Sequence, residues 1–173
     1  MRLKILVALF LSLTAYAVAD ILFSPYSTTY AQYYFDGDGA PETTTISAAL
    51  TPVILQATYV EIGYRNGITF TASPFSVTYS GYEQEFKLYT NVALIGTETG
   101  IHSYATIIVK NGSFLEYTRS FGVTVNNTDI FGITGNSIIT MDSGDVLELM
   151  IACIDGAFDV RAVQSKFTLF SLQ

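Results

Sequence analysis

The chain has 173 residues, of which 50% are hydrophobic and only 13% are charged, and its formal net charge is −7. This acidic balance argues against nucleic acid as a partner, because a protein that binds the phosphate backbone needs clustered Lys and Arg. The single cysteine excludes an intrachain disulfide, and 12 Tyr and 12 Phe without Trp favour strands over helices. The length suits one domain around one hydrophobic core.

Residues 1–19 have the order of features typical of a secretion signal. Arg2 and Lys4 precede an apolar run, and Ala17-Val18-Ala19 supplies small residues immediately before Asp20. The apolar stretch 5–19 is short for a bilayer span. We therefore expect a signal peptide over 1–19, no stable membrane span, and a mature protein that is secreted or displayed on an extracellular surface. Two alternatives stay open: a buried first element of a cytosolic domain, and a retained membrane or filament-core helix.

Residues 20–45 predict a Tyr-rich extended arm or a first strand. If the arm left its own domain and completed the sheet of a neighbour, its tyrosines would be the donor side chains. These candidate donor residues are Tyr26, Tyr30, Tyr33 and Tyr34.

The turn that follows is acidic and rich in glycine. Asp36, Asp38 and Glu42 offer the hard oxygen ligands that calcium prefers, but the segment lacks the third acidic position and the long spacing of a full calcium loop. A solvated acidic turn is the alternative to a calcium site.

Residues 46–173 predict an all-β domain. From residue 85 to 94 apolar and polar side chains alternate, which is the pattern of a strand with one face in the core. Asn111-Gly112 predicts a hairpin, and Asp142-Ser143-Gly144-Asp145 predicts a second tight turn. About eight to ten short strands without a helical stripe predict an antiparallel two-sheet sandwich or a barrel.

The order of these motifs resembles the jelly-roll domains of the C1q and tumour necrosis factor type. The relevant segments are Phe75-Ser76-Val77-Thr78-Tyr79-Ser80-Gly81-Tyr82, the Val109-Lys110-Asn111-Gly112 hairpin, the strand pair around Gly144-Asp145, and the closing strand from Phe167 to Leu172. The resemblance covers about residues 44–173 and implies a jelly-roll sandwich. Similar domains also cap viral fibres and coat bacterial spores, so the resemblance further implies a trimeric, surface-displayed head.

A trimer is physically reasonable because surplus aromatic side chains on a sandwich need a covering surface. The candidate oligomer-interface residues on strand faces are Tyr79, Tyr89 and Tyr104. The alternative for each is packing within its own subunit.

Few residues are suited to catalysis or metal binding. His102 falls in a predicted loop, where we expect a solvated side chain, and no nucleophile elbow lies nearby. Cys153 lies in an apolar run and is expected to be a small buried hydrophobe, with an intermolecular disulfide as the alternative. One His and one Cys far apart in the chain do not make an ordinary zinc site. We predict no catalytic residues, no cofactor and no metal.

Asn111 and Asn126 each begin a glycosylation acceptor motif and lie in predicted turns.

The leading hypothesis is a secreted, non-enzymatic structural, adhesion or recognition protein that self-assembles, as a homotrimer, on a cell or virus surface. Its partners would be itself and a surface glycan or protein receptor. A filament subunit assembled by donor-strand exchange of the arm is the first alternative. An extracellular hydrolase is the second, because carboxylates distant in sequence can converge in space.

Overall fold

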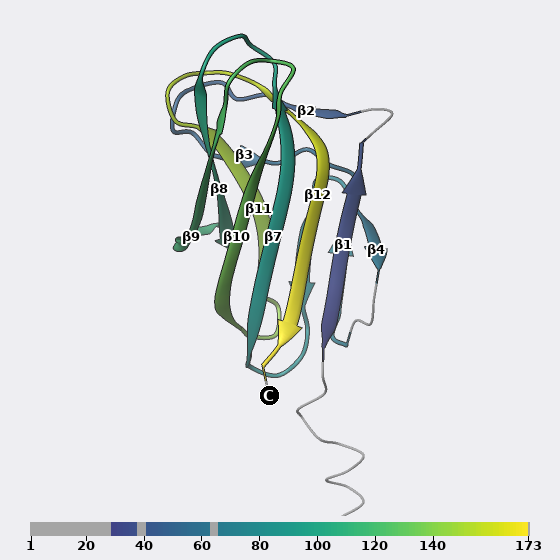
Figure 1. Cartoon of the computed structure of the whole chain (residues 1–173). Helices are drawn as coiled ribbons and strands as arrows, with labels where there is room; N and C mark the ends of the chain where they lie inside the picture. The colour runs from purple at the N-terminus through teal and green to yellow at the C-terminus, as the bar shows by residue number, and fades with distance from the viewer. Residues whose placement is uncertain (1–28, 38–40, 63–65, 173) are drawn as a thin grey trace, which may run out of the picture.

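The computed structural model describes residues 29–37, 41–62 and 66–172, and these residues form strands and turns without a helix. Two antiparallel sheets, sheet A and sheet B, pack face to face around one core (Figure 1). The predicted all-β jelly-roll sandwich is therefore confirmed. Within the described ranges no helix is long and apolar enough to cross a membrane.

Sheet A has six strands, with β12 and β1 in its middle. The order is β10-β7-β12-β1-β4, and the short β2 also pairs with β12. Their bounds are β10 (Ile130–Met141), β7 (Gln84–Gly96), β12 (Val160–Ser171), β1 (Tyr30–Asp36), β4 (Val60–Ile62) and β2 (Glu42–Thr44).

Sheet B also has six strands, in the order β5-β6-β11-β8-β9, with β3 pairing to β11. Their bounds are β5 (Ile68–Thr71), β6 (Ser76–Tyr79), β11 (Val146–Cys153), β8 (His102–Lys110), β9 (Ser113–Thr124) and β3 (Val53–Ile54). From β6 onward the chain crosses repeatedly between the sheets, so sequence neighbours such as β6 and β7 lie in different layers. This crossing connectivity is that of a jelly roll.

The alternation predicted for residues 85–94 is confirmed in β7. Phe86, Leu88, Val92 and Leu94 are buried in the core, and the intervening side chains point away from it. Because the side-chain period of a strand is two, one face of β7 packs on sheet B while the other forms the outer surface of sheet A.

A cluster of aromatic rings fills the core. The ring centroids of Tyr59 and Phe75 are 4.0 Å apart, and those of Phe75 and Phe167 are 5.0 Å apart. The buried hydroxyl of Tyr59 hydrogen-bonds to that of Ser165, which satisfies both polar groups away from water. The core therefore accommodates tyrosines as well as phenylalanines.

Two of the predicted turns are tied to each other. Asn111 and Gly112 have φ angles of 52° and 77°, as a tight hairpin turn requires. Asn111 Nδ2 donates to Asp145 Oδ1 at 2.6 Å, and the Val146 backbone N–H donates to Asn111 Oδ1 at 2.8 Å. Lys110 Nζ lies 2.8 Å from Asp145 Oδ2. The hairpin at 111–112 and the turn at 142–145 thus form one polar clamp.

Three details add to what the sequence patterns indicated. Residues 160–171 form one strand, β12, with a bulge between Ala162 and Gln164. The motif around Gly81 joins β6 of sheet B to β7 of sheet A. Residues 53–71 contribute three short strands that the sequence patterns did not predict.

Candidate functional site

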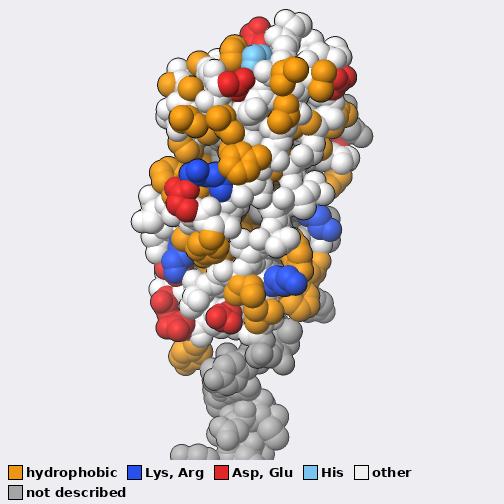
Figure 2. All heavy atoms as spheres, turned by 60° about the vertical axis from the view of Figure 1, so that its left-hand side comes forward, with side chains coloured by type: hydrophobic (Ala, Val, Ile, Leu, Met, Phe, Trp, Pro, Cys, Tyr) orange, Lys and Arg blue, Asp and Glu red, His pale blue; other side chains and the backbone are white. Residues whose placement is uncertain are grey.

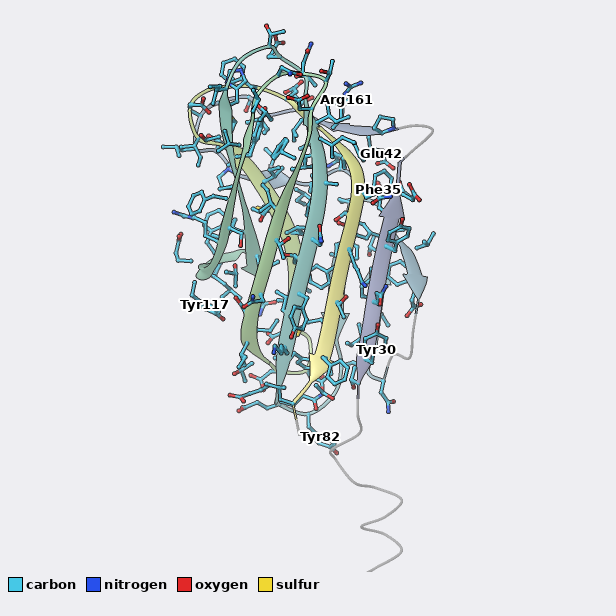
Figure 3. The ribbon with its side chains drawn as sticks, viewed as in Figure 1. Tyr30, Phe35, Glu42, Tyr82, Tyr117 and Arg161 are labelled. Atoms are coloured by element: carbon cyan, nitrogen blue, oxygen red, sulfur yellow. The ribbon has the colours of Figure 1, made fainter. Side chains whose placement is uncertain are left out.

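The outer face of sheet A carries aromatic and polar side chains. We call it the sheet A face, and it comprises Tyr30, Gln32 and Tyr34 of β1, Lys166 and Phe170 of β12, Lys87, Tyr89 and Asn91 of β7, and Ile138 of β10. The rings of Tyr30 and Phe170 meet edge to face at 5.6 Å, where β1 begins beside the end of β12 (Figure 3). Lys87 Nζ lies 5.1 Å from the centroid of the Tyr89 ring, a cation–π contact.

The middle of the sheet A face is hollowed. A shallow pocket of about 320 Å³ is lined by Tyr30, Gln32, Tyr89, Asn91, Thr134 and Lys166, among others. The sheet supplies a rigid floor because every lining side chain stands on a paired strand. Aromatic rings, amides and one ammonium at its surface suit contacts with another protein or with a polar ligand.

The three tyrosines predicted for an oligomer interface have different locations. Tyr89 is 41% exposed on the sheet A face. Tyr79 and Tyr104 are buried in their own subunit, where Tyr79 packs against Phe86 and Tyr104 against Phe131. For those two, the alternative of packing within the subunit is what the structure shows. An interface role stays a prediction for Tyr89 alone.

The arm tyrosines lie in β1 as far as the structure describes them. Tyr33 is buried in the core, and Tyr30 and Tyr34 lie on the sheet A face, while Tyr26 falls outside the described residues. β1 pairs with β12 of the same chain over all its seven residues. Residues 30–36 therefore complete the sheet of their own subunit in this structure.

A second apolar surface lies on the opposite sheet. The β9 patch consists of Phe121, Val123 and Val125, which are 50–63% exposed. Figure 2 shows hydrophobic side chains gathered on the side of the molecule that carries β9 and β10. Because large exposed apolar patches are uncommon on monomeric proteins, the patch indicates a contact surface.

His102 is not the solvated loop residue that the sequence suggested. It begins β8 and is buried, and its ring centroid lies 3.8 Å from that of Phe158, with the two rings tilted by 33°. Its Nδ1 lies 3.3 Å from Asp155 Oδ2, and Cys153 Sγ donates to Asp155 Oδ1 at 3.2 Å. His102 and Cys153 are far apart in the chain, but the pairing of β8 with β11 brings both to Asp155.

This cluster is nevertheless unsuited to nucleophilic chemistry. Burial, together with the hydrogen bond that the thiol donates to Asp155, raises the pKa of Cys153 and suppresses the thiolate. Burial alone would raise the pKa of Asp155 as well, but the Ser103 backbone N–H, the Cys153 thiol and His102 outweigh it and lower that pKa. Cys153 is fully buried, as expected, so its sulfur does not face another subunit.

Two of the three acidic residues considered as calcium ligands, Asp36 and Glu42, accept hydrogen bonds from other residues. Asp36 Oδ2 accepts a hydrogen bond from the Tyr34 hydroxyl at 3.0 Å, and Glu42 Oε1 accepts one from the Thr58 backbone N–H at 2.9 Å. Asp38 lies outside the described residues. Among the residues that are described, no three His, Cys, Asp or Glu side chains gather closely enough to hold a metal.

The two acceptor asparagines differ in their surroundings. Asn111 belongs to the polar clamp. Asn126 lies in the exposed turn between β9 and β10, where its Nδ2 donates to Asp129 Oδ2 at 2.7 Å and its Oδ1 accepts from Thr128. Glycosylation at either position stays a prediction.

Comparison with known proteins identifies the fold. No family model matches the sequence, and no curated protein matches it. The structure is similar to that of Eiger TNF from S. frugiperda, with a TM-score of 0.59 and 10% identity over 86% of this chain and 94% of that chain. It is also similar to murine APRIL at pH 8.0, with a TM-score of 0.52 and 11% identity over 83% of this chain and all of that chain.

These similarities define the class of structure. The chain has a jelly-roll fold of the tumour necrosis factor type, in agreement with the motif order read from the sequence. Since identities near 10% carry the fold and not the activity, function has to be argued from the surfaces of this chain.

Proposed function

We propose that this protein is a non-enzymatic, extracellular recognition or structural head that assembles with copies of itself, as a homotrimer. The observation that carries the proposal is the sheet A face, where Tyr30, Tyr89 and Phe170 stay at the surface although the core is complete without them. Tyrosine suits such a contact, because its ring is buried while its hydroxyl keeps a polar partner.

The chain offers two surfaces for a contact between copies. The sheet A face and the β9 patch are different surfaces on opposite sheets. A contact of one with the other on the next copy would be heterologous, and such contacts close into a ring only when the rotation between copies closes. The resemblance to C1q and tumour necrosis factor heads supports three copies per ring.

Extracellular location rests on the sequence of residues 1–19, which lie outside the described residues. We propose that they act as a signal peptide and that residues 20–173 form the mature protein. No observation favours the filament, in which β1 would have to pair with another copy.

Light scattering of the purified protein tests the assembly. We expect the mass of three copies, and Tyr89→Lys should shift it toward one copy because a charge enters the interface. Ile101→Lys is the matched control, since Ile101 is exposed in the β7–β8 loop and belongs to neither surface. A single-copy mass for the unmodified protein across micromolar concentrations would overturn the proposal.

A further inference from the structure

We propose that the outer face of sheet B holds a binding site for an amphiphilic carboxylate, a ligand with an apolar chain and one anionic head group. The site is a groove between β9 and residues 50–52. It lies on the sheet opposite the sheet A face and shares Phe121 with the β9 patch.

The groove has the size and lining of a ligand site. Its volume is about 390 Å³, and its lining residues are Leu50, Pro52, Ala105, Ile107, Arg119, Phe121, Ala152 and Ile154. Ala105 and Ile107 of β8 and Ala152 of β11 are nearly buried and form the floor. Small-molecule sites typically measure about 300–1,000 Å³ and are mainly apolar with few polar groups. Here the single charged lining residue is Arg119.

Leu50 forms one wall of the groove and has a strained backbone conformation. Its φ is 58°, in the left-handed region, and its side chain is 68% exposed. The Leu50 backbone N–H donates to the Cys153 carbonyl at 2.8 Å, which fixes the loop over the end of β11. A left-handed conformation is strained for a leucine, because its Cβ comes too close to the following carbonyl oxygen. Gly and Asn adopt the left-handed conformation more easily than leucine does. Because the Leu50 side chain is exposed, its burial does little to offset the strain. Backbone outliers of this kind cluster at ligand clamps.

Phe121 forms the opposite wall and is 62% exposed. Two apolar side chains therefore project on either side of an apolar floor. An acyl chain laid between them would contact both walls and the floor, and the burial of this apolar surface would stabilise the complex.

Arg119 selects the head group. Its guanidinium is paired with Glu116, three residues earlier on the same strand, and both side chains are well exposed. Exposed pairs of this kind are weak, so Arg119 can exchange Glu116 for the carboxylate of a ligand. A planar guanidinium matches a carboxylate with two parallel hydrogen bonds. Because the whole chain carries a net charge of −7, non-specific attraction would favour a cationic amphiphile instead.

Titration with two amphiphiles of equal chain length tests the site. Decanoate and decyltrimethylammonium, both below their micelle concentrations, are titrated into the purified protein by calorimetry and by NMR. We expect decanoate to bind one per chain, more tightly than the cation, and to shift the amide signals of Ala105, Ile107 and Ala152.

Charge variants distinguish a specific head-group contact from non-specific apolar binding. Arg119→Gln should weaken decanoate about fivefold to tenfold, since charge-assisted hydrogen bonds are lost. Glu116→Gln should strengthen decanoate because it frees the guanidinium. Arg161→Gln removes a cation of β12 that belongs neither to the groove nor to the sheet A face, and it should leave decanoate binding unchanged.

Leu50→Asn separates a binding role from a structural one. Asn tolerates the left-handed backbone, so we expect an unchanged or higher unfolding midpoint together with at least about threefold weaker decanoate binding. A Leu50 that only supports the fold would lower the midpoint and leave binding unchanged.

Four results would overturn the proposal: no one-to-one binding of decanoate, equal affinity for the cation, binding insensitive to both Arg119→Gln and Leu50→Asn, or loss of oligomers with Leu50→Asn while decanoate binding persists. The last result would identify the groove as a contact between copies.

Discussion

Gly81 lies so close to the side chain of Tyr79 that a Cβ at position 81 would come within 2.2 Å of the Tyr79 hydroxyl oxygen. That hydroxyl is fixed in place, because it donates to the Tyr82 carbonyl at 2.8 Å and accepts from Gln84 Nε2 at 2.6 Å. The glycine lets the chain close over the ring as it passes from β6 in sheet B to β7 in sheet A. This contact gives a physical reason for a glycine in the motif that suggested the fold.

Gly81→Ala should therefore destabilise the protein by about 1–3 kcal/mol, because the added methyl group overpacks a fixed ring. Urea unfolding followed by circular dichroism measures the change. Gly132→Ala is the matched control, since a Cβ at Gly132 would meet nothing within 4 Å. Equal midpoints for the two variants would contradict the steric explanation.

The polar clamp predicts a dependence of stability on pH. Burial alone would raise the pKa of Asp145, but the Lys110 ammonium, the Asp142 backbone N–H and the Asn111 amide outweigh it and hold that pKa below its ordinary value of 3.8. Since the folded-state pKa is the lower one, the stabilisation is present above pH 3.8 and is lost as the pH falls through the folded-state value.

Asp145→Asn should cost about 1–3 kcal/mol at neutral pH and flatten this acidic part of the stability profile. Unfolding midpoints measured from pH 2 to pH 7 test both effects, with Asp142→Asn, an exposed neighbour, as the control. An unaltered acid slope in Asp145→Asn would show that another carboxylate is responsible.

Asn111 and Asn126 should respond differently to substitution. Asn111→Gln should lower stability by about 1 kcal/mol or more even in protein made without glycosylation, because the longer side chain loses its place in the clamp. Asn126→Gln should cost less, since its turn is solvated. Thermal melts of both variants from a bacterial host make the comparison, and equal losses would count against the clamp.

The Cys153 thiol should be inert in the folded protein. Burial raises its pKa, so little thiolate is present near neutral pH. A disulfide reagent such as DTNB should react slowly with native protein and stoichiometrically in urea. Rapid native labelling, or dimers on a non-reducing gel, would contradict the buried location.

Some features of the fold could be predicted because they depend on local patterns. The burial alternation along β7 follows from the two-residue side-chain period of a strand, which is visible in the sequence. The Asn111-Gly112 turn follows from the preference of these two residues for positive φ angles. β3, β4 and β5 are two to four residues long, too short for a period to appear. Their pairing depends on neighbours in other parts of the chain.

The surfaces were harder to predict than the strands. Tyr79, Tyr89 and Tyr104 are alike in sequence, and only the placement of each strand face decides that Tyr89 reaches solvent. The contact of His102 with Asp155 joins two positions that are 53 residues apart in the chain. The sheet B groove combines four separate segments of the chain and depends on the left-handed backbone of Leu50, which no sequence pattern indicates.

The position of β12 has a consequence for synthesis. It is bonded to β7 on one side and to β1 on the other, so sheet A stays in two pieces until residues 160–171 are available. A nascent chain that lacks these residues cannot complete sheet A, because β1 and β7 are connected only by their pairing with β12. Folding is thereby postponed until translation has passed residue 171, and every shorter product is a substrate for chaperones and proteases.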